Sequence, residues 1–342
     1  MHVGAASILL PMLEIVPFDA SMLTEAGALL AASHARARLA EPLLPAAYED
    51  VERAQGGLAE LLGRDGAGGV AAVRDGHLAG FLIGVRRPPP NRVLSLLYHG
   101  QALAADESAV LYQDLYAVMA ADWLRRGFFV HLVDVPHADS ARQTAWDALG
   151  FGRGSDLAVR DLSWPMRDVS GPMGEPDSVE VRRGDAGDVE ALVELSDQLL
   201  RHESTPPLLL PYLDDQRKRL RAEVEEHLAE PASTYFVARV AGKPVGMHLL
   251  LPRPGSSKLL TPDGSVYLSQ AVVDPAHRRR GVGRALLRQS LAWAKEQGYE
   301  MCILHYMTAN LSGSRFWAAN GFRPLAQTRA RLFEERITWA HA

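Results

Sequence analysis

Cysteine is almost absent from this chain, since Cys302 is the only one among 342 residues. A single cysteine can form neither an intrachain disulfide nor a metal site built on several thiolates. The 12 histidines show no HExxH motif and no other paired ligand spacing, so no metal site is expected. Low cysteine usage is typical of a reducing compartment, and we expect a cytoplasmic protein.

Long apolar runs and an excess of basic residues are also absent. No stretch approaches the ~20 apolar residues that a membrane span needs. Residues 5–13 are apolar, but Arg36 is the first basic side chain, so a signal peptide is not expected. The formal net charge of -5 argues against general nucleic-acid binding, because neutralising phosphates requires a positive surface. We therefore expect small molecules or proteins as partners, and neither nucleic acid nor a membrane.

The chain is longer than a typical single domain, and its 47% apolar residues suffice for two cores. Residues 163–178 are rich in Pro, Gly, Ser and Asp and lack apolar periodicity, which predicts a linker. The order of predicted elements is similar on both sides, as expected after a duplication. The sequence thus predicts two tandem domains, 1–162 and 179–342, joined by a linker over 163–178.

Apolar periodicity predicts alternating strands and helices in both halves. In the second half these are strands over 179–183, 234–240, 245–251, 266–273 and 301–306, and helices from 185 onward, over 212–228 and over 283–297. In the first half they are strands over 12–16, 70–73, 78–85, 93–98 and 128–135, and helices over 20–39, 48–62, 110–125 and 140–149. The order strand, helix, strand over 266–306 predicts a parallel pair with a right-handed crossover.

Residues 272–287, VVDPAHRRRGVGRALL, leave a predicted strand, turn through two glycines and enter a predicted helix. Without β-carbons, Gly281 and Gly283 leave successive N–H groups accessible at a helix N-terminus, an arrangement that binds phosphate. Four arginines add positive charge suited to phosphate, namely Arg278, Arg279, Arg280 and Arg284. The pattern predicts a pyrophosphate cradle. The alternative is a turn that only caps the helix, with its arginines in water.

A second block, residues 310–322 (NLSGSRFWAANGF), follows the next predicted strand. Together the two blocks resemble the acyl-CoA-binding motif Q/R-x-x-G-x-G/A of the GNAT acetyltransferase superfamily and its following Asn, aromatic, Gly-Phe helix. The resemblance covers about residues 179–330, with a degenerate echo over about 12–160. The tandem arrangement resembles that of two-domain bacterial members such as mycothiol synthase.

This resemblance implies an α/β (α+β) fold, in which each domain has a mixed, mostly antiparallel sheet with a splayed parallel pair and flanking helices. It implies acetyl-CoA as co-substrate and, as acceptor, a primary amine of a small molecule or peptide. Residues 278–283 would hold the pyrophosphate, chiefly through backbone N–H groups. Val272 and Val273 would offer backbone groups to the pantetheine arm, and Asn310 would bond it further along. Asn310 is equally suited to cap a helix.

The catalytic residues of the resemblance are less well matched. Where many members carry a strand carboxylate this chain has Tyr267, a poor base at its usual pKa of about 10. Tyr267 could align water or be an ordinary strand aromatic. Where many members carry a tyrosine that protonates the departing thiolate, this chain has Trp317, whose indole cannot act as an acid.

Substitute proton donors lie on the second parallel strand and the next helix, namely His305, Tyr306, Ser312 and Ser314. His305 is the preferred candidate because its pKa lies near the operating pH, although a structural histidine fits too. His202 and Glu203 end a predicted helix where acceptors enter in this fold. They could act as a base or recognise substrate charge, or they could simply be solvated.

The first half lacks the glycine turn, because residues 99–108 contain one glycine, no arginine and the acids Asp106 and Glu107. Like charges would repel a pyrophosphate. We expect a structural or substrate-shaping domain that does not bind CoA productively.

Three functions stay open at this point. They are transfer of a short acyl group to an amine, acyl-CoA sensing without catalysis, and transfer to a hydroxyl. The sequence identifies neither the acceptor nor the oligomeric state.

Overall fold

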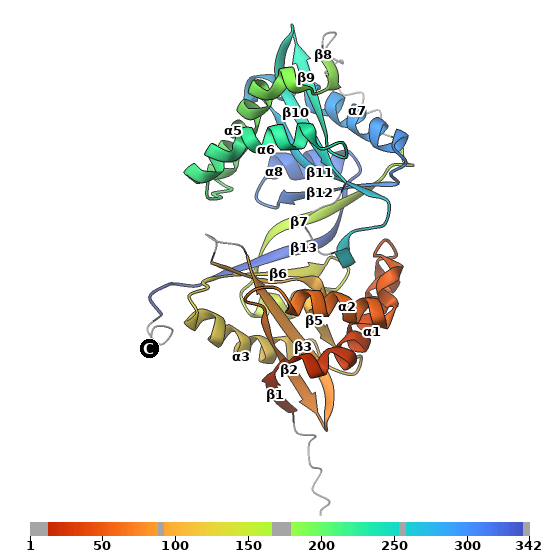
Figure 1. The fold of residues 1–342 in the computed structure, drawn as a ribbon, viewed down its shortest axis with the longest axis vertical. Helices are drawn as coiled ribbons and strands as arrows, with labels where there is room; N and C mark the ends of the chain where they lie inside the picture. Colours follow the sequence, from red (N-terminus) through yellow and green to blue (C-terminus); the bar gives the residue numbers. More distant parts are fainter. Residues whose placement is uncertain (1–12, 88–91, 166–178, 253–257, 338–342) are drawn as a thin grey trace, which may run out of the picture. The chain divides into compact units, whose positions relative to one another are not determined.

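The computed structural model describes residues 13–87, 92–165, 179–252 and 258–337. Most of the predicted linker, residues 166–178, lies outside this range. The chain divides into two compact units (Figure 1). Unit 1 comprises residues 1–154, 257–260 and 326–342, and unit 2 comprises residues 155–256 and 261–325.

Unit 1 is a mixed sheet with flanking helices. Its strands are β1 (Leu13–Pro17), β2 (Gly68–Arg74), β3 (His77–Arg86), β4 (Val93–Leu96), β5 (Gln101–Leu103), β6 (Val130–Pro136) and residues 326–332 of β13 (Arg323–Leu332). The helices are α1 (Leu23–Ala40), α2 (Val51–Leu62), α3 (Leu111–Arg125) and α4 (Ser140–Ala148). The strand order is β1-β2-β3-β4-β6-β13, with β5 on β3, and only β4 and β6 pair in parallel.

Unit 2 repeats this plan. Its strands are residues 155–161 of β7 (Gly152–Asp161), β8 (Val179–Arg183), β9 (Thr234–Val240), β10 (Lys243–Leu251), β11 (Ser265–Val273) and β12 (Met301–Met307). Its helices are α5 (Val189–Ser204), α6 (Asp214–Ala229), α7 (Val282–Glu296) and α8 (Leu311–Ala319). The order is β7-β12-β11-β10-β9-β8, and β11 and β12 form the parallel pair. The predicted mixed, mostly antiparallel fold class is confirmed.

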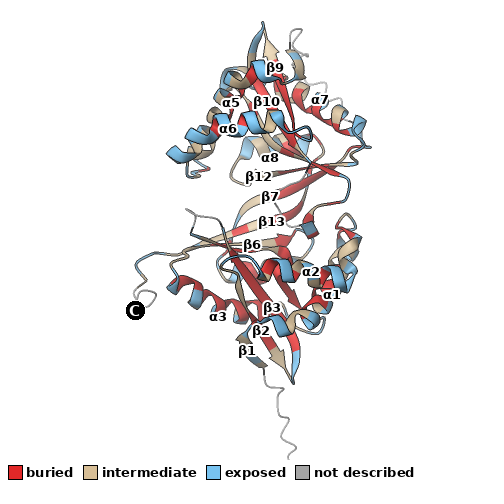
Figure 2. Ribbon diagram, viewed as in Figure 1, coloured by how far each residue is buried: buried red, intermediate tan, exposed pale blue. Residues whose placement is uncertain are grey.

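Strand β9 shows how the unit 2 sheet is covered on both faces. Phe236 and Ala238 belong to a core cluster with apolar residues of α7 and α8. Tyr235 and Val237, which alternate with them, belong to a second cluster with residues of α5 and α6. Side chains alternate between the two faces of a strand, so a strand buried on both faces reads as a continuous apolar run. Figure 2 shows this burial along the strands.

The compact units differ from the sequence segments 1–162 and 179–342, because unit 1 also includes residues 258–260 and the two units exchange strands. Residues 155–161 of β7 pair with β12 in unit 2, from Ser155 opposite Met307 to Asp161 opposite Met301. Residues 326–332 of β13 pair with β6 in unit 1, from Ala326 opposite Pro136 to Leu332 opposite Val130. Each unit is therefore completed by a strand from the other half of the sequence. A cut between residues 162 and 179 would remove a strand from both units.

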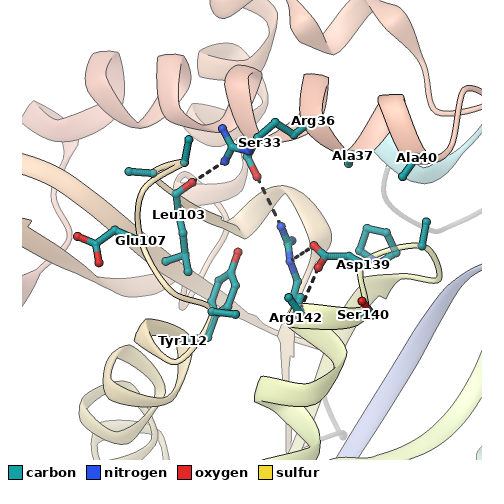
Figure 3. Close-up of a pocket in the computed structure, with 16 residues that line it drawn as sticks. Ser33, Arg36, Ala37, Ala40, Leu103, Glu107, Tyr112, Asp139, Ser140 and Arg142 are labelled. Atoms are coloured by element: carbon teal, nitrogen blue, oxygen red, sulfur yellow. Dashed lines mark hydrogen bonds and ion pairs between the residues drawn. The ribbon is translucent and has the colours of Figure 1, made fainter.

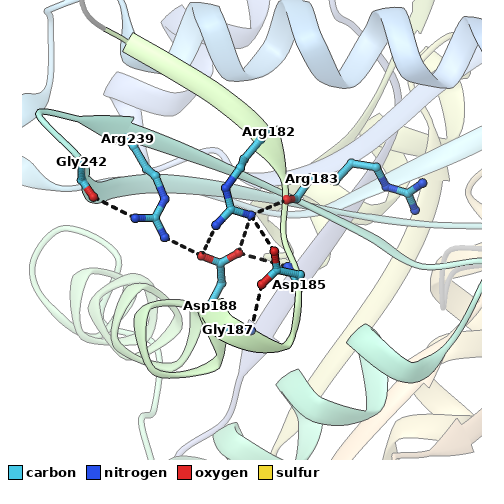
Figure 4. Close-up of polar contacts among 7 residues, drawn as sticks. All are labelled: Arg182, Arg183, Asp185, Gly187, Asp188, Arg239 and Gly242. Carbon is cyan, nitrogen blue, oxygen red and sulfur yellow. Dashed lines mark hydrogen bonds and ion pairs between the residues drawn. The ribbon is translucent and has the colours of Figure 1, made fainter.

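Helix α5, which carries two of the predicted site residues at its end, begins at a buried ion network (Figure 4). The fully buried carboxylate of Asp188 accepts hydrogen bonds from Arg182 at 2.9 Å and from Arg239 at 2.7 Å. Its Oδ2 also accepts the backbone N–H of Asp185 at 3.0 Å, which completes a capping box. Strands β8 and β9 are thus tied to the start of α5.

Candidate functional site

The parallel pair in unit 2 opens after three residues. Ser265, Val266 and Tyr267 are in register with residues 301–303 of β12, and within the described residues the pairing goes no further. Strand β11 continues on β10 with a register shift between Leu249 and Leu250, which leaves Ser269 as an extra residue. Such a bulge bends its strand. Beyond Tyr267, β11 and β12 therefore diverge, which gives the predicted parallel pair its splayed form.

The antiparallel ladder decides which backbone groups of β11 face the opening. The N–H of Asp274 donates to the C=O of Val245 on β10 at 2.8 Å. Bonded and non-bonded pairs alternate along such a ladder, so the polar groups of Val272 also face β10. Val273 and Ala271, rather than Val272, therefore have backbone groups that face away from β10, and the sequence analysis did not name Ala271.

The turn after β11 leads directly into α7. Asp274 caps the short helix over 275–277 by accepting the Ala276 N–H at 2.8 Å. Arg279 and Gly281 then adopt left-handed φ values of 61° and 82°. The first intrahelical bonds run to the Gly281 C=O, from the Arg284 N–H at 3.0 Å and from the Ala285 N–H at 2.9 Å. The N–H groups of Val282 and Gly283 precede those bonds, as the first donors of a helix do. They form the open, positive end of the α7 dipole.

Gly281 and Gly283 differ in how far the structure requires a glycine. Gly281 is the N-cap of α7 and its φ of 82° disfavours any other residue. Gly283 lies inside the helix, where a β-carbon would meet Phe316 and Val273 at 3.6 Å, an ordinary contact distance. The protein's own packing therefore accepts a β-carbon at position 283, so packing alone does not require glycine there.

Four arginines lie in the turn and at the start of α7. The side chains of Arg278, Arg279 and Arg280 are exposed and that of Arg284 is partly buried. Arg278 donates through Nε to the C=O of Val273 at 3.0 Å, which ties the turn to the end of β11. The segment that leads to the α7 N–H groups is therefore positively charged.

The four candidate catalytic and substrate residues gather in unit 2. The hydroxyl of Tyr267 lies 3.3 Å from Nδ1 of His305 on the neighbouring strand. Burial raises the pKa of Tyr267, and the nearby charge of Glu203 raises it further. Burial likewise raises the pKa of Glu203 itself. Burial and then the charge of Arg278 lower the pKa of His202. The end of α5 thus places Glu203 within electrostatic range of Tyr267, and His202 within electrostatic range of Arg278.

Asn310 is the N-cap of α8, and its Oδ1 accepts the Gly313 N–H at 3.0 Å. The hydroxyl of Ser312 donates to the same oxygen at 2.9 Å, and that of Ser314 donates to the Asn310 carbonyl at 2.8 Å. These serines therefore support the cap, which makes them weak candidates for a proton donor. Asn310 therefore caps α8, which is one of the two roles that the sequence suggested. The cap does not use its Nδ2 group, which is left for a ligand.

The last helix contributes core residues. Trp317 is 9% exposed and packs edge-on against Phe316 and Phe322, with ring centroids 4.9 Å and 5.4 Å apart. Gly321 has a φ of 85° and follows the end of the helix.

Another candidate proton donor, Tyr306 of β12, donates its hydroxyl to Asp156 at 2.9 Å. The His305–Tyr267 pair is therefore the better-placed proton carrier.

Neither a metal site nor a membrane-spanning helix is found among the described residues. Among them no three His, Cys, Asp or Glu side chains are arranged to hold a metal ion. None of their helices is both long enough and apolar enough to cross a membrane.

Comparison with known proteins agrees with this geometry. The model of the acetyltransferase (GNAT) family matches residues 198–322, which include the turn, the divergent strands and α8. Over these residues the chain is similar to GNAT-family acetyltransferases. It is 33% identical to human N-acetyltransferase 8 over 104 residues, which are 30% of this chain and 44% of that protein. It is 28% identical to mycothiol acetyltransferase from Thermobispora bispora over 176 residues, 51% of this chain and 57% of the relative.

The chain therefore spans about half the length of the curated relatives it matches. Among solved structures, the GCN5-related N-acetyltransferase from Sphaerobacter thermophilus aligns with a TM-score of 0.61 at 15% identity. That alignment covers 94% of this chain and 95% of the other, so the GNAT-like fold extends over both units.

Proposed function

We propose that this protein is an N-acetyltransferase that moves an acetyl group from acetyl-CoA to a primary amine of a small molecule or peptide. The observation that carries the proposal is the open N-terminus of α7, with a glycine at position 283 where packing would accept a β-carbon. The matched relatives are named as acetyltransferases, which supports the same reaction class.

The residues present fit acetyl-CoA. The N–H groups of Val282 and Gly283 would bind the pyrophosphate, with charge supplied by the arginines at 278–280 and 284. The outward groups of Val273 and Ala271 would bond the pantetheine amides as a further strand does. The Nδ2 group of Asn310 would donate to the pantetheine further along the arm.

The reaction needs two proton movements. The amine must be neutral when its nitrogen attacks the thioester carbonyl, and the departing sulfur must gain a proton. We assign removal of the amine proton to Glu203, because its raised pKa makes it a stronger base than an exposed carboxylate. We assign delivery of a proton to the sulfur to the Tyr267–His305 pair, because the Tyr267 hydroxyl lies 3.3 Å from His305 Nδ1, through which a donated proton can be replaced.

His202, which precedes Glu203 at the end of α5, would contribute to acceptor binding. Its pKa is lowered by burial and by Arg278, so it is neutral at neutral pH. A neutral imidazole can accept a hydrogen bond from an amine or hydroxyl of the acceptor.

A second candidate function is acyl-CoA binding without transfer. The burial of Trp317 in the core favours it, because the position offers no hydroxyl to the thiolate. Calorimetry with acetyl-CoA, followed by a thiol-release assay with a panel of primary amines and matched alcohols, separates the two. We expect binding and amine-dependent release. Binding without release across the panel would favour the sensor, and release with alcohols alone would indicate a hydroxyl acceptor.

A further inference from the structure

Unit 1 contains a cavity of about 360 Å³, whose lining includes none of the site residues described above (Figure 3). It lies among α1, the segment after β5, the start of α3 and the start of α4, and is lined among others by Ser33, Arg36, Leu103, Tyr112 and Arg142. Its volume falls at the small end of the range of ~300–1,000 Å³ typical of ligand sites. The cavity is thus of a size to enclose a small molecule.

Arg142 is the unusual group of this cavity. Its side chain is only 5% exposed, and its guanidinium lies over the rings of Tyr98 and Tyr112 at 5.4 Å and 5.2 Å. Its Nη2 reaches Ser33 Oγ at a long 3.5 Å, while Nη1 has no hydrogen-bond partner among the described residues. A buried charged donor without an acceptor is costly, and native proteins rarely keep one without a reason. An anion bound in the cavity would supply the acceptor.

The charges around the cavity leave room for one negative charge. Asp139 lies 2.9 Å from Arg142 Nε, and it also caps α4 by accepting the Arg142 backbone N–H at 3.0 Å. Glu107 is paired with Arg74 at 2.6 Å. Arg74 lies outside the lining and neutralises Glu107, so the lining residues Arg36 and Arg142 stand against the single remaining carboxylate of Asp139, which leaves a net charge of one positive. A monoanion balances the cavity, and a multiply charged phosphate chain does not.

The remaining wall is apolar and built from small side chains. It includes Ala37 and Ala40 of α1, Leu103 at the end of β5 and Ala141 of α4. The Tyr112 ring adds an aromatic surface, and Figure 3 shows its hydroxyl directed towards α1. A ligand that fits this lining has one anionic end and a short apolar body.

We propose that unit 1 binds a small monocarboxylic acid, whose carboxylate accepts hydrogen bonds from Arg142 and whose apolar body lies against Ala37, Ala40 and Leu103. The planar guanidinium suits a carboxylate, and such charge-assisted hydrogen bonds are among the stronger ones. The site gives a physical reason to keep a buried arginine in a unit without the glycine turn.

The test uses the full-length protein, with straight-chain carboxylates from butyrate to octanoate as probes and their primary amides as uncharged controls. Binding is followed by saturation-transfer NMR and by titration. We expect saturable binding of at least one carboxylate, with its amide at least about tenfold weaker. Absence of saturable binding by every carboxylate, or equal binding of acid and amide, overturns the proposal.

Two matched variants locate the site. Ala37→Leu fills the cavity from α1 and should weaken the bound carboxylate by at least about tenfold. Ala32→Leu makes the same change on the exposed side of the same helix and should leave the affinity within about twofold. Arg142→Gln, when folded by circular dichroism, should abolish the preference for acid over amide. Equal affinity in both alanine variants contradicts the assignment. Unchanged carboxylate binding in Gly283→Glu would separate this site from the turn in unit 2.

Discussion

The hydroxyl of Tyr267 lies 3.3 Å from Nδ1 of His305, and the two rings meet edge-to-face with a centroid distance of 5.7 Å. The residues are 38 positions apart in the sequence and come from β11 and β12. They meet just where the parallel pairing of these strands ends at Tyr267 and Ile303. The geometry thus places two proton carriers at the mouth of the opening in which we propose the thioester lies.

Removing either group should slow transfer without removing cofactor binding. Tyr267→Phe and His305→Ala should each lower kcat by roughly 10²–10⁴, the range of a general acid or base. Acetyl-CoA affinity, measured by calorimetry, should change little. Tyr306→Phe is the matched control, because it removes a hydroxyl that bonds Asp156. Full turnover in both site variants would show that water or the substrate handles the protons.

Glu203 should set the acid limb of the pH profile. Because burial raises its pKa, the carboxyl is still partly protonated at pH values where an exposed glutamate is ionised. Activity should therefore fall as the pH drops through this raised pKa, and Glu203→Gln should lower the rate and remove that limb. Glu194→Gln, an exposed change on the same helix, should leave the profile as it is. An unchanged limb in Glu203→Gln would mean that another group is the base.

Two substitutions separate the helix-capping role of Asn310 from its proposed role in acetyl-CoA binding. Asn310→Asp keeps an oxygen to accept the Gly313 N–H, but it replaces the Nδ2 donor with a negative charge. The melting temperature should stay close to that of the unchanged protein while acetyl-CoA affinity falls. Asn310→Ala should lose both, with a stability cost of about 0.5–2 kcal/mol for the missing cap. If Asn310→Asp binds acetyl-CoA normally, Asn310 is only a cap.

The order of elements could be predicted from the sequence because periodicity is a local property. The helix predicted over 283–297 is α7, Val282–Glu296, and the hairpin strands over 234–240 and 245–251 correspond to β9 and β10. The strands over 152–161 and 323–332 were not predicted. Their partners lie in the other half of the sequence, and no local pattern indicates such an exchange.

Part of the candidate site could also be predicted from the sequence. Glycine and arginine spacing pointed to the turn, because backbone conformation and charge can be read residue by residue. That Val273 and Ala271 face the opening while Val272 faces β10 depends on the register of the ladder. The proximity of Glu203 to Tyr267 depends on how α5 packs on β11. Neither the register of the ladder nor the packing of α5 on β11 can be read from the sequence alone.

Asp188 should control stability at acid pH. Burial alone would raise its pKa, but hydrogen bonds from Asp185, Arg239 and Arg182 outweigh burial and lower it. A carboxyl with a lowered pKa in the folded state stabilises the fold above its unfolded pKa of about 3.9, and this contribution is lost as the pH falls through the folded pKa. Asp188→Asn should lower the melting temperature at pH 7 and flatten its decrease below about pH 4. An acid unfolding curve that Asp188→Asn leaves unchanged would contradict this role.

The measurement that tests the central claim most directly is the acetyl-CoA affinity of full-length Gly283→Glu, with melting temperature recorded in parallel. A glutamate there would block the α7 N–H groups by its bulk and would repel a diphosphate, while the packing accepts a β-carbon at 3.6 Å from its neighbours. Gly57→Glu is the control, because it places the same residue in open space on another helix, α2. We expect Gly283→Glu to stay folded and bind at least tenfold more weakly, about 1.4 kcal/mol, while Gly57→Glu binds normally. A folded Gly283→Glu protein with unchanged affinity would contradict the assignment of this turn as the acetyl-CoA site.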